Sequence, residues 1–180
     1  MSPRDPYSPV PELNLLFAFQ RSHGFEDYAD GFGLTTYGDP AGLESGWSKD
    51  PGFLAGLISF AQANGSGSFY ALWRVDDRAD LATLPVVVFG DEGGQHVVAR
   101  NLRELLQLVG YDCEISVDWD EAYYYRGEDF EHRRGHAEYV AWLDQHFGLA
   151  PAADPDSLVS AAQAEFGDRF AAWANPFLPG

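Results

Sequence analysis

The stretch from Pro85 to Gly110, PVVVFGDEGGQHVVARNLRELLQLVG, restricts the fold of this chain more than any other part of the sequence. Two apolar runs flank the turn residues 90–94, a pattern that predicts an antiparallel hairpin at about 86–98. Asn101 with Glu104 resembles a capping box, and leucines follow at helical spacing up to Gly110, which predicts a helix over 102–109. A hairpin that leads directly into a helix favours an α+β fold over a doubly wound parallel sheet.

Other segments predict further helices and strands without linkers or repeats. We predict a helix over 53–64, because Asp50-Pro51 matches a helix start and the apolar residues that follow have helical spacing. In this interpretation Asn64-Gly65 closes the helix, and the alternating residues 69–75 form a strand. LNLLFAF begins an earlier helix, GFGLTTYG at 31–38 gives a short strand, and two more helices fall within about 136–175.

At 180 residues, with 46% apolar content, the chain is long enough to fold as one domain over 1–180. Within it we distinguish a core at 53–109, an N-terminal extension at 1–50, an acidic segment at 112–131 and C-terminal helices at about 136–175. The single cysteine, Cys113, excludes an internal disulfide. No signal peptide and no membrane-spanning run is evident, so we expect a cytoplasmic protein.

The net charge of −17 is the strongest global signal. Such a field repels nucleic acid and anionic lipid, so we expect neither as a partner, and it attracts basic proteins. The alternative is that the charge only keeps the protein soluble. The acidic segment 112–131 contains eight acidic residues and one arginine, which makes it the place to look for a basic partner.

The beginning of the acidic segment alternates strictly between apolar and polar residues. This period of two predicts a strand over 112–120 with an apolar face and an acidic face. Trp119 shares the parity of Ile115 and Val117, which places it on the apolar face and makes the three tyrosines the safer anchors. The candidate partner-binding residues are Asp112, Glu114, Asp118, Asp120, Glu121, Tyr123, Tyr124, Tyr125, Glu128, Asp129, Asp91 and Glu92.

Asp91 and Glu92 lie at the glycine-flanked tip of the predicted hairpin. Glycines supply positive φ and Asp tolerates turn geometry, so a plain turn requires residues of these types. An acid/base pair would need its two carboxylates in different environments, which neighbours on an exposed tip lack. We therefore interpret GDEGG as a turn that contacts a partner at most.

No convincing catalytic or metal-binding set is present. His132 and His136 have the spacing of a helical ligand pair, but RRG stands where a zinc protease has its Glu. The sequence from Asp118 imitates a calcium loop, yet Tyr123 occupies the position of the turn glycine and Asp129 that of the bidentate Glu. We expect no catalytic residue, no cofactor and no metal at these positions or at Asp91 and Glu92.

The segments FLAGLISFAQANGSGSFYALW and LPVVVFGDEGGQHVVARNLRELLQLV resemble the core of the SUKH superfamily. The resemblance covers Phe53 to Val109. The superfamily includes a fungal cell-wall assembly regulator and many bacterial immunity proteins. The resemblance implies an α+β domain with a mixed, twisted sheet flanked by helices, no enzyme activity, and GDEGG as a structural hairpin of the family. It provides no catalytic residues to transfer.

Three functional hypotheses follow. The first is an immunity protein that occludes a bacterial toxin. A nuclease is the toxin class that we expect, because nuclease surfaces are basic and this chain is acidic. The second is an intracellular regulator or scaffold, as the fungal members suggest. The third is a small hydrolase with unrecognised carboxylates, which requires a deep pocket and a perturbed acid. Neither the partner's identity nor the oligomeric state follows from the sequence.

Overall fold

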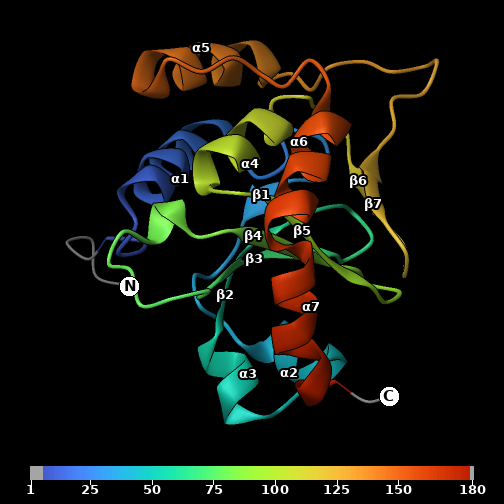
Figure 1. The fold of residues 1–180 in the computed structure, drawn as a ribbon. Helices are drawn as coiled ribbons and strands as arrows, with labels where there is room; N and C mark the ends of the chain where they lie inside the picture. The colour runs from blue at the N-terminus through green and yellow to red at the C-terminus, as the bar shows by residue number, and fades with distance from the viewer. Residues whose placement is uncertain (1–5, 179–180) are drawn as a thin grey trace.

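The centre of the protein is a five-stranded sheet with helices on both faces (Figure 1). The computed structural model describes residues 6–178, so residues 1–5 and 179–180 of the predicted domain lie outside the described part. The strands pair in chain order: β1 (Gly33–Leu34), β2 (Leu57–Gln62), β3 (Phe69–Trp73), β4 (Val86–Phe89) and β5 (Gln95–Ala99). The α+β class is confirmed. The prediction of a mixed sheet is wrong, because each of these four strand pairings is antiparallel.

Helices form a layer on each side of this sheet. On one side (top of Figure 1) lie α1 (Pro11–His23), α4 (Leu102–Val109) and α5 (His136–Phe147). On the other side lie α2 (Ala41–Gly46), α3 (Pro51–Ala55) and α7 (Asp168–Ala174). The helix α6 (Pro155–Ala162) continues through a π-helical stretch, Gln163–Gly167, into α7, and short 3-10 turns occupy Leu81–Thr83 and Asn175–Phe177.

Strand β4 shows why the sheet needs two helical layers. Val86 and Val88 pack into the core beneath α1, α4 and α5, whereas Val87 and Phe89 pack into the core that contains α3 and α7 residues. Successive side chains of a strand point to opposite faces, and all four are fully buried. Burial on both faces is the physical reason for the uninterrupted apolar run PVVVF.

The predicted hairpin and the helix after it are confirmed. Val88 pairs with His96 across the hairpin, and α4 has the predicted bounds. The Glu104 backbone N–H donates to the Asn101 side chain at 2.9 Å, and the Glu104 carboxylate accepts the Arg100 backbone N–H at 2.9 Å. The cap thus follows the predicted logic, with the returning hydrogen bond one residue earlier than in a capping box.

The predicted helix over 53–64 is wrong beyond its first turn. Asp50 caps α3 as expected, accepting the Gly52 N–H at 2.8 Å, but the helix ends at Ala55 and residues 57–62 form β2. A bulge between Ser59 and Ala61 adds a residue to β2, so apolar side chains fall at 57, 58, 60 and 61. That spacing imitates a helix although the residues pair with β3.

Elsewhere the predicted helices agree with α1, α5 and the α6–α7 stretch, and the strand at 31–38 is reduced to Gly33–Leu34. The N-terminal segment from residue 6 is part of the core rather than an appendage. Leu13 and Leu16 of α1 are fully buried.

A second, two-stranded sheet packs beside the first. It pairs β6 (Ile115–Val117) with β7 (Ala122–Tyr124), so the strand predicted over 112–120 is much shorter than expected. The Tyr70 and Tyr124 hydroxyl groups form a buried hydrogen bond at 3.0 Å between the two sheets. The Asn64 side-chain amide donates to the Ile115 carbonyl at 3.0 Å. Asn64 therefore joins the sheets instead of closing a helix.

The tyrosine pair gives a test of this sheet docking. Tyr70→Phe and Tyr124→Phe should each lower the free energy of unfolding by about 1–3 kcal/mol, because each leaves one buried hydroxyl unpaired. The double variant should lose less than the sum of the two, since both polar groups are then gone. Urea denaturation measures this, with the exposed Tyr125→Phe as a control that should change stability by less than about 0.5 kcal/mol. Strictly additive losses would contradict the buried contact.

Candidate functional site

The turn between β4 and β5 is held by hydrogen bonds, as the turn interpretation of GDEGG expects. The Gly90 N–H donates to the Gly94 carbonyl at 2.9 Å, and the Gly93 N–H donates to the Gly90 carbonyl at 3.0 Å. The Asp91 carboxylate accepts hydrogen bonds from the hydroxyls of Ser68 at 2.7 Å and Ser66 at 2.9 Å. Both hydrogen bonds lower the pKa of Asp91, and the bond from Ser68 has the larger effect. The exposed Asp91 side chain therefore stays ionised.

The turn between β6 and β7 lies directly against this first turn (right side of Figure 1). The Asp118 N–H closes it by donating to the Glu121 carbonyl at 2.8 Å. The His96 ring N–H donates to the Asp118 carbonyl at 2.7 Å. Gly94 has a φ of 85°, and a Cβ there would lie 2.1 Å from the Asp118 carbonyl oxygen. Only glycine allows so close an approach of the two backbones.

Together the two turns form what we call the two-hairpin surface, which comprises the exposed residues Asp91, Glu92, Asp118, Trp119, Asp120 and Glu121. Trp119 is 75% exposed. Its ring lies over Gly93, where an added Cβ would be 2.4 Å from the indole Cζ2. The placement of Trp119 on an apolar strand face is wrong, because β6 ends at Val117 and the alternation beyond it belongs to the turn.

A pocket of about 380 Å³ opens beside Trp119. Its lining residues are Gly46, Trp47, Gly90, Asp91, Gly93, Gln95, Trp119, Asn175 and Leu178. The Trp47 indole N–H donates to the Gln95 side-chain oxygen at 3.2 Å, and its ring packs edge-on against Phe89 at 4.9 Å between centroids. Neither Trp47 nor Gln95 was predicted as a site residue, because only the fold brings Trp47 to the hairpin that contains Gln95.

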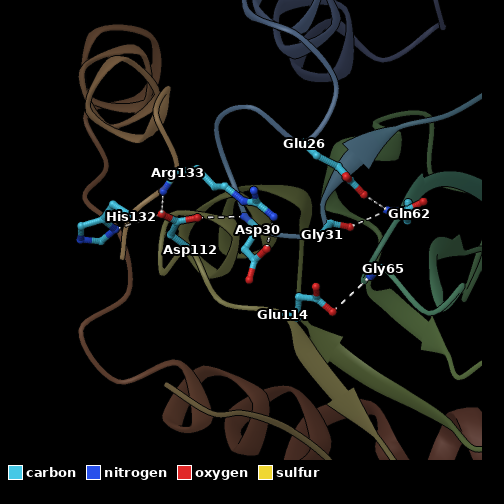
Figure 2. Close-up of polar contacts among 9 residues, drawn as sticks. All are labelled: Glu26, Asp30, Gly31, Gln62, Gly65, Asp112, Glu114, His132 and Arg133. Carbon is cyan, nitrogen blue, oxygen red and sulfur yellow. Dashed lines mark hydrogen bonds and ion pairs between the residues drawn. The ribbon is translucent and has the colours of Figure 1, made fainter. Parts of the chain in front are cut away.

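Two of the predicted contact residues, Asp112 and Tyr124, are buried and cannot form part of a surface. The Asp112 carboxylate accepts the N–H groups of Asp30 at 2.8 Å and Arg133 at 2.7 Å and contacts the His132 ring nitrogen at 3.0 Å (Figure 2). Its backbone has a φ of 62°, unusual for a non-glycine residue. The acidic face predicted for 112–120 is thus wrong at its first position. Asp112 joins three chain segments.

The half-buried Glu114 also has a role within the protein, since it accepts the Gly65 N–H at 3.2 Å (Figure 2). Glu114, Tyr125, Glu128 and Asp129 line a second, wider depression of about 710 Å³. His132, Arg133 and Arg134 line it as well, so its charge is mixed. Tyr123 is half-buried on β7. The structure therefore separates the predicted contact residues into two surfaces and an interior group.

Asp112, His132 and His136 are the group that could hold a metal ion among residues 6–178, since one ligand atom of each lies within 4.8 Å of the others. Both carboxylate oxygens of Asp112 already accept N–H groups, and the His136 ring N–H donates to the Gly110 carbonyl at 3.0 Å. The two imidazole rings stack in parallel at 3.8 Å with 7° between their planes, so their in-plane lone pairs do not converge. This is the geometry of a hydrogen-bonded cluster, and the expectation of no metal stays a prediction.

Comparisons with protein families, with curated proteins and with solved structures find no match to this chain. Across residues 6–178, every helix is too short or too polar to cross a membrane.

The contact between the two turns can be tested at Gly94. Gly94→Ala and the control Gly38→Ala both place alanine at positive φ, which costs about 1 kcal/mol, but Gly38 has nothing within 4 Å of the added Cβ. Gly94→Ala should therefore destabilise the protein by about 1–3 kcal/mol more than the control, because the Asp118 backbone must move. It should also shift the Trp119 indole N–H resonance, identified by its loss in Trp119→Phe. Equal losses in the two variants would argue against the contact.

Proposed function

We propose that this chain is a SUKH-type immunity protein that neutralises a bacterial toxin by covering a basic surface of it. The resemblance over Phe53–Val109 supports the proposal. After residue 68, the strand, hairpin and helix that the resemblance implies occur in the expected order. Before that residue, most of the expected helix over 53–64 is the strand β2. In this proposal the protein acts by binding alone, in the cytoplasm of the cell that it protects, and contacts neither nucleic acid nor membrane.

The observation that best supports this function is the exposed Trp119 among five carboxylates on the two-hairpin surface. Protein interfaces are enriched in aromatic residues, and a few such anchors provide most of the binding energy. An aromatic ring rimmed by polar groups has the composition of an interface anchor. Trp119 thus replaces the three tyrosines as the principal anchor.

The carboxylates would orient and accelerate binding. With a net charge of −17, the chain attracts a basic protein over a distance limited by the Debye length of about 8 Å at physiological salt. A turn that projects its acids outward meets the partner first. An acid/base role for these carboxylates fits poorly, because Asp91 is exposed and its lowered pKa keeps it charged.

Rescue from the toxin is the direct test. The proposal predicts a large toxin gene next to the gene for this chain. Expression of that toxin should arrest growth of a host culture, and co-expression of this chain should restore growth. A purified one-to-one complex should block the activity of the toxin. Absence of rescue, together with a stable complex with a protein unrelated to toxins, would favour the regulator or scaffold alternative.

Charge removal should change the kinetics of that complex in a specific way. Asp118→Asn, Asp120→Asn and Glu121→Gln combined should slow association about tenfold at low salt and flatten its salt dependence, because steering depends on charge. The matched control combines Asp77→Asn, Glu138→Gln and Asp144→Asn, three exposed acids outside the two turns. Stopped-flow measurements at low and high salt compare the two. Identical rates and salt slopes would refute the role of the two-hairpin surface.

Trp119→Ala should act on dissociation instead. Loss of a buried anchor commonly costs about 2 kcal/mol or more, which corresponds to an approximately thirtyfold faster dissociation with little change in association. Tyr125→Ala, at the second depression, is the comparison. A larger effect of Tyr125→Ala would move the interface to that depression.

A further inference from the structure

We propose that the pocket between Trp47 and Trp119 binds one arginine side chain of the basic partner. This inference rests on the proposed function, because the basic partner supplies the arginine. The proposed function requires only that the partner be basic, whereas this inference specifies which side chain of the partner enters the pocket.

The aromatic walls of the pocket are held in place before any ligand enters. Trp47 is fixed by its hydrogen bond to Gln95 and by edge-on contacts with Phe89 and Phe69, at centroid distances of 4.9 and 5.8 Å. Trp119 rests on the backbone at Gly93. Pre-organised walls reduce the entropy lost on binding. The volume of about 380 Å³ lies at the lower end for ligand pockets, which suits a single side chain.

The polar groups of the pocket select a cation. Two serine hydroxyls donate to Oδ1 of Asp91, whereas Oδ2 accepts no hydrogen bond from residues 6–178. Gln95 also lines the pocket, and its side-chain oxygen has a lone pair beyond the one that Trp47 uses. Hydrogen-bond acceptors beside aromatic faces favour a cation over an anion. An apolar side chain in the pocket would leave these acceptors without a hydrogen-bond donor.

Arginine fits this arrangement better than lysine. Its planar guanidinium stacks on an indole face and still donates in its own plane to a carboxylate. A lysine ammonium is a strongly hydrated point charge that loses more solvation on entering a pocket walled by two tryptophans. Trp119 and Asp91 both line the pocket, so a stacking face and a carboxylate are offered to the same ligand.

The test uses N-acetyl-L-arginine amide as the probe and the full chain, followed by NMR. Titration should shift the Trp47 and Trp119 indole N–H resonances in a saturable way. The uncharged isostere N-acetyl-L-citrulline amide should bind at least about tenfold more weakly, and the lysine analogue also more weakly than arginine. Asp91→Asn should weaken arginine binding about tenfold and Trp119→Ala should abolish it, whereas the control Asp77→Asn should leave it unchanged.

The outcomes separate this inference from the proposed function. Arginine binding with these preferences supports the pocket even if no toxin is neutralised. Equal binding of arginine and citrulline, or binding unaffected by Trp119→Ala, would overturn the inference. So would toxin neutralisation by a protein whose indole resonances do not respond to arginine.

Discussion

Burial of the central sheet on both faces is the constraint on which the rest of the structure depends. Because helices cover both faces, β4 has no solvent side, and its residues must all be apolar. The outer edge of β5 is covered in part by the stretch after α6, where the Gln163 side chain donates to the Val97 carbonyl. What remains of the sheet for contact with other molecules is chiefly the turns at the ends of its strands. The candidate site lies at such an end.

The two-hairpin surface depends in turn on the close approach of two backbones. Gly93 and Gly94 provide the positive φ angles that a tight hairpin turn requires. They also leave room for the Trp119 ring and the Asp118 backbone, which an added Cβ would contact. The second hairpin is held from its other end by the buried Tyr70–Tyr124 pair. Packing in the interior thus fixes the position of a tryptophan in solvent.

The acidic residues of the segment 112–131 occupy two kinds of environment that net charge does not distinguish. Asp112 and Glu114 satisfy backbone N–H groups of other segments, and Asp112 does so in the interior at the cost of an unfavourable backbone conformation. Asp118, Asp120 and Glu121, a few positions along the chain, project into solvent. The proposed attraction of a basic partner concerns the second group alone.

The sequence by itself determined the α+β class, the β4–β5 hairpin, the start of α3 and the bounds of α4, because caps, turns and two-sided burial leave local signals. It misassigned residues 57–62, because a bulge shifts the apolar positions of a strand into helical spacing. Of the two-hairpin surface it named Asp91, Glu92 and the acids of the second turn as contact candidates, but it assigned Trp119 to an apolar strand face and Asp112 and Tyr124 to the surface. Only the tertiary structure decided these positions and brought Trp47 to the pocket. Contacts between residues far apart in the sequence leave no periodic signal in one chain.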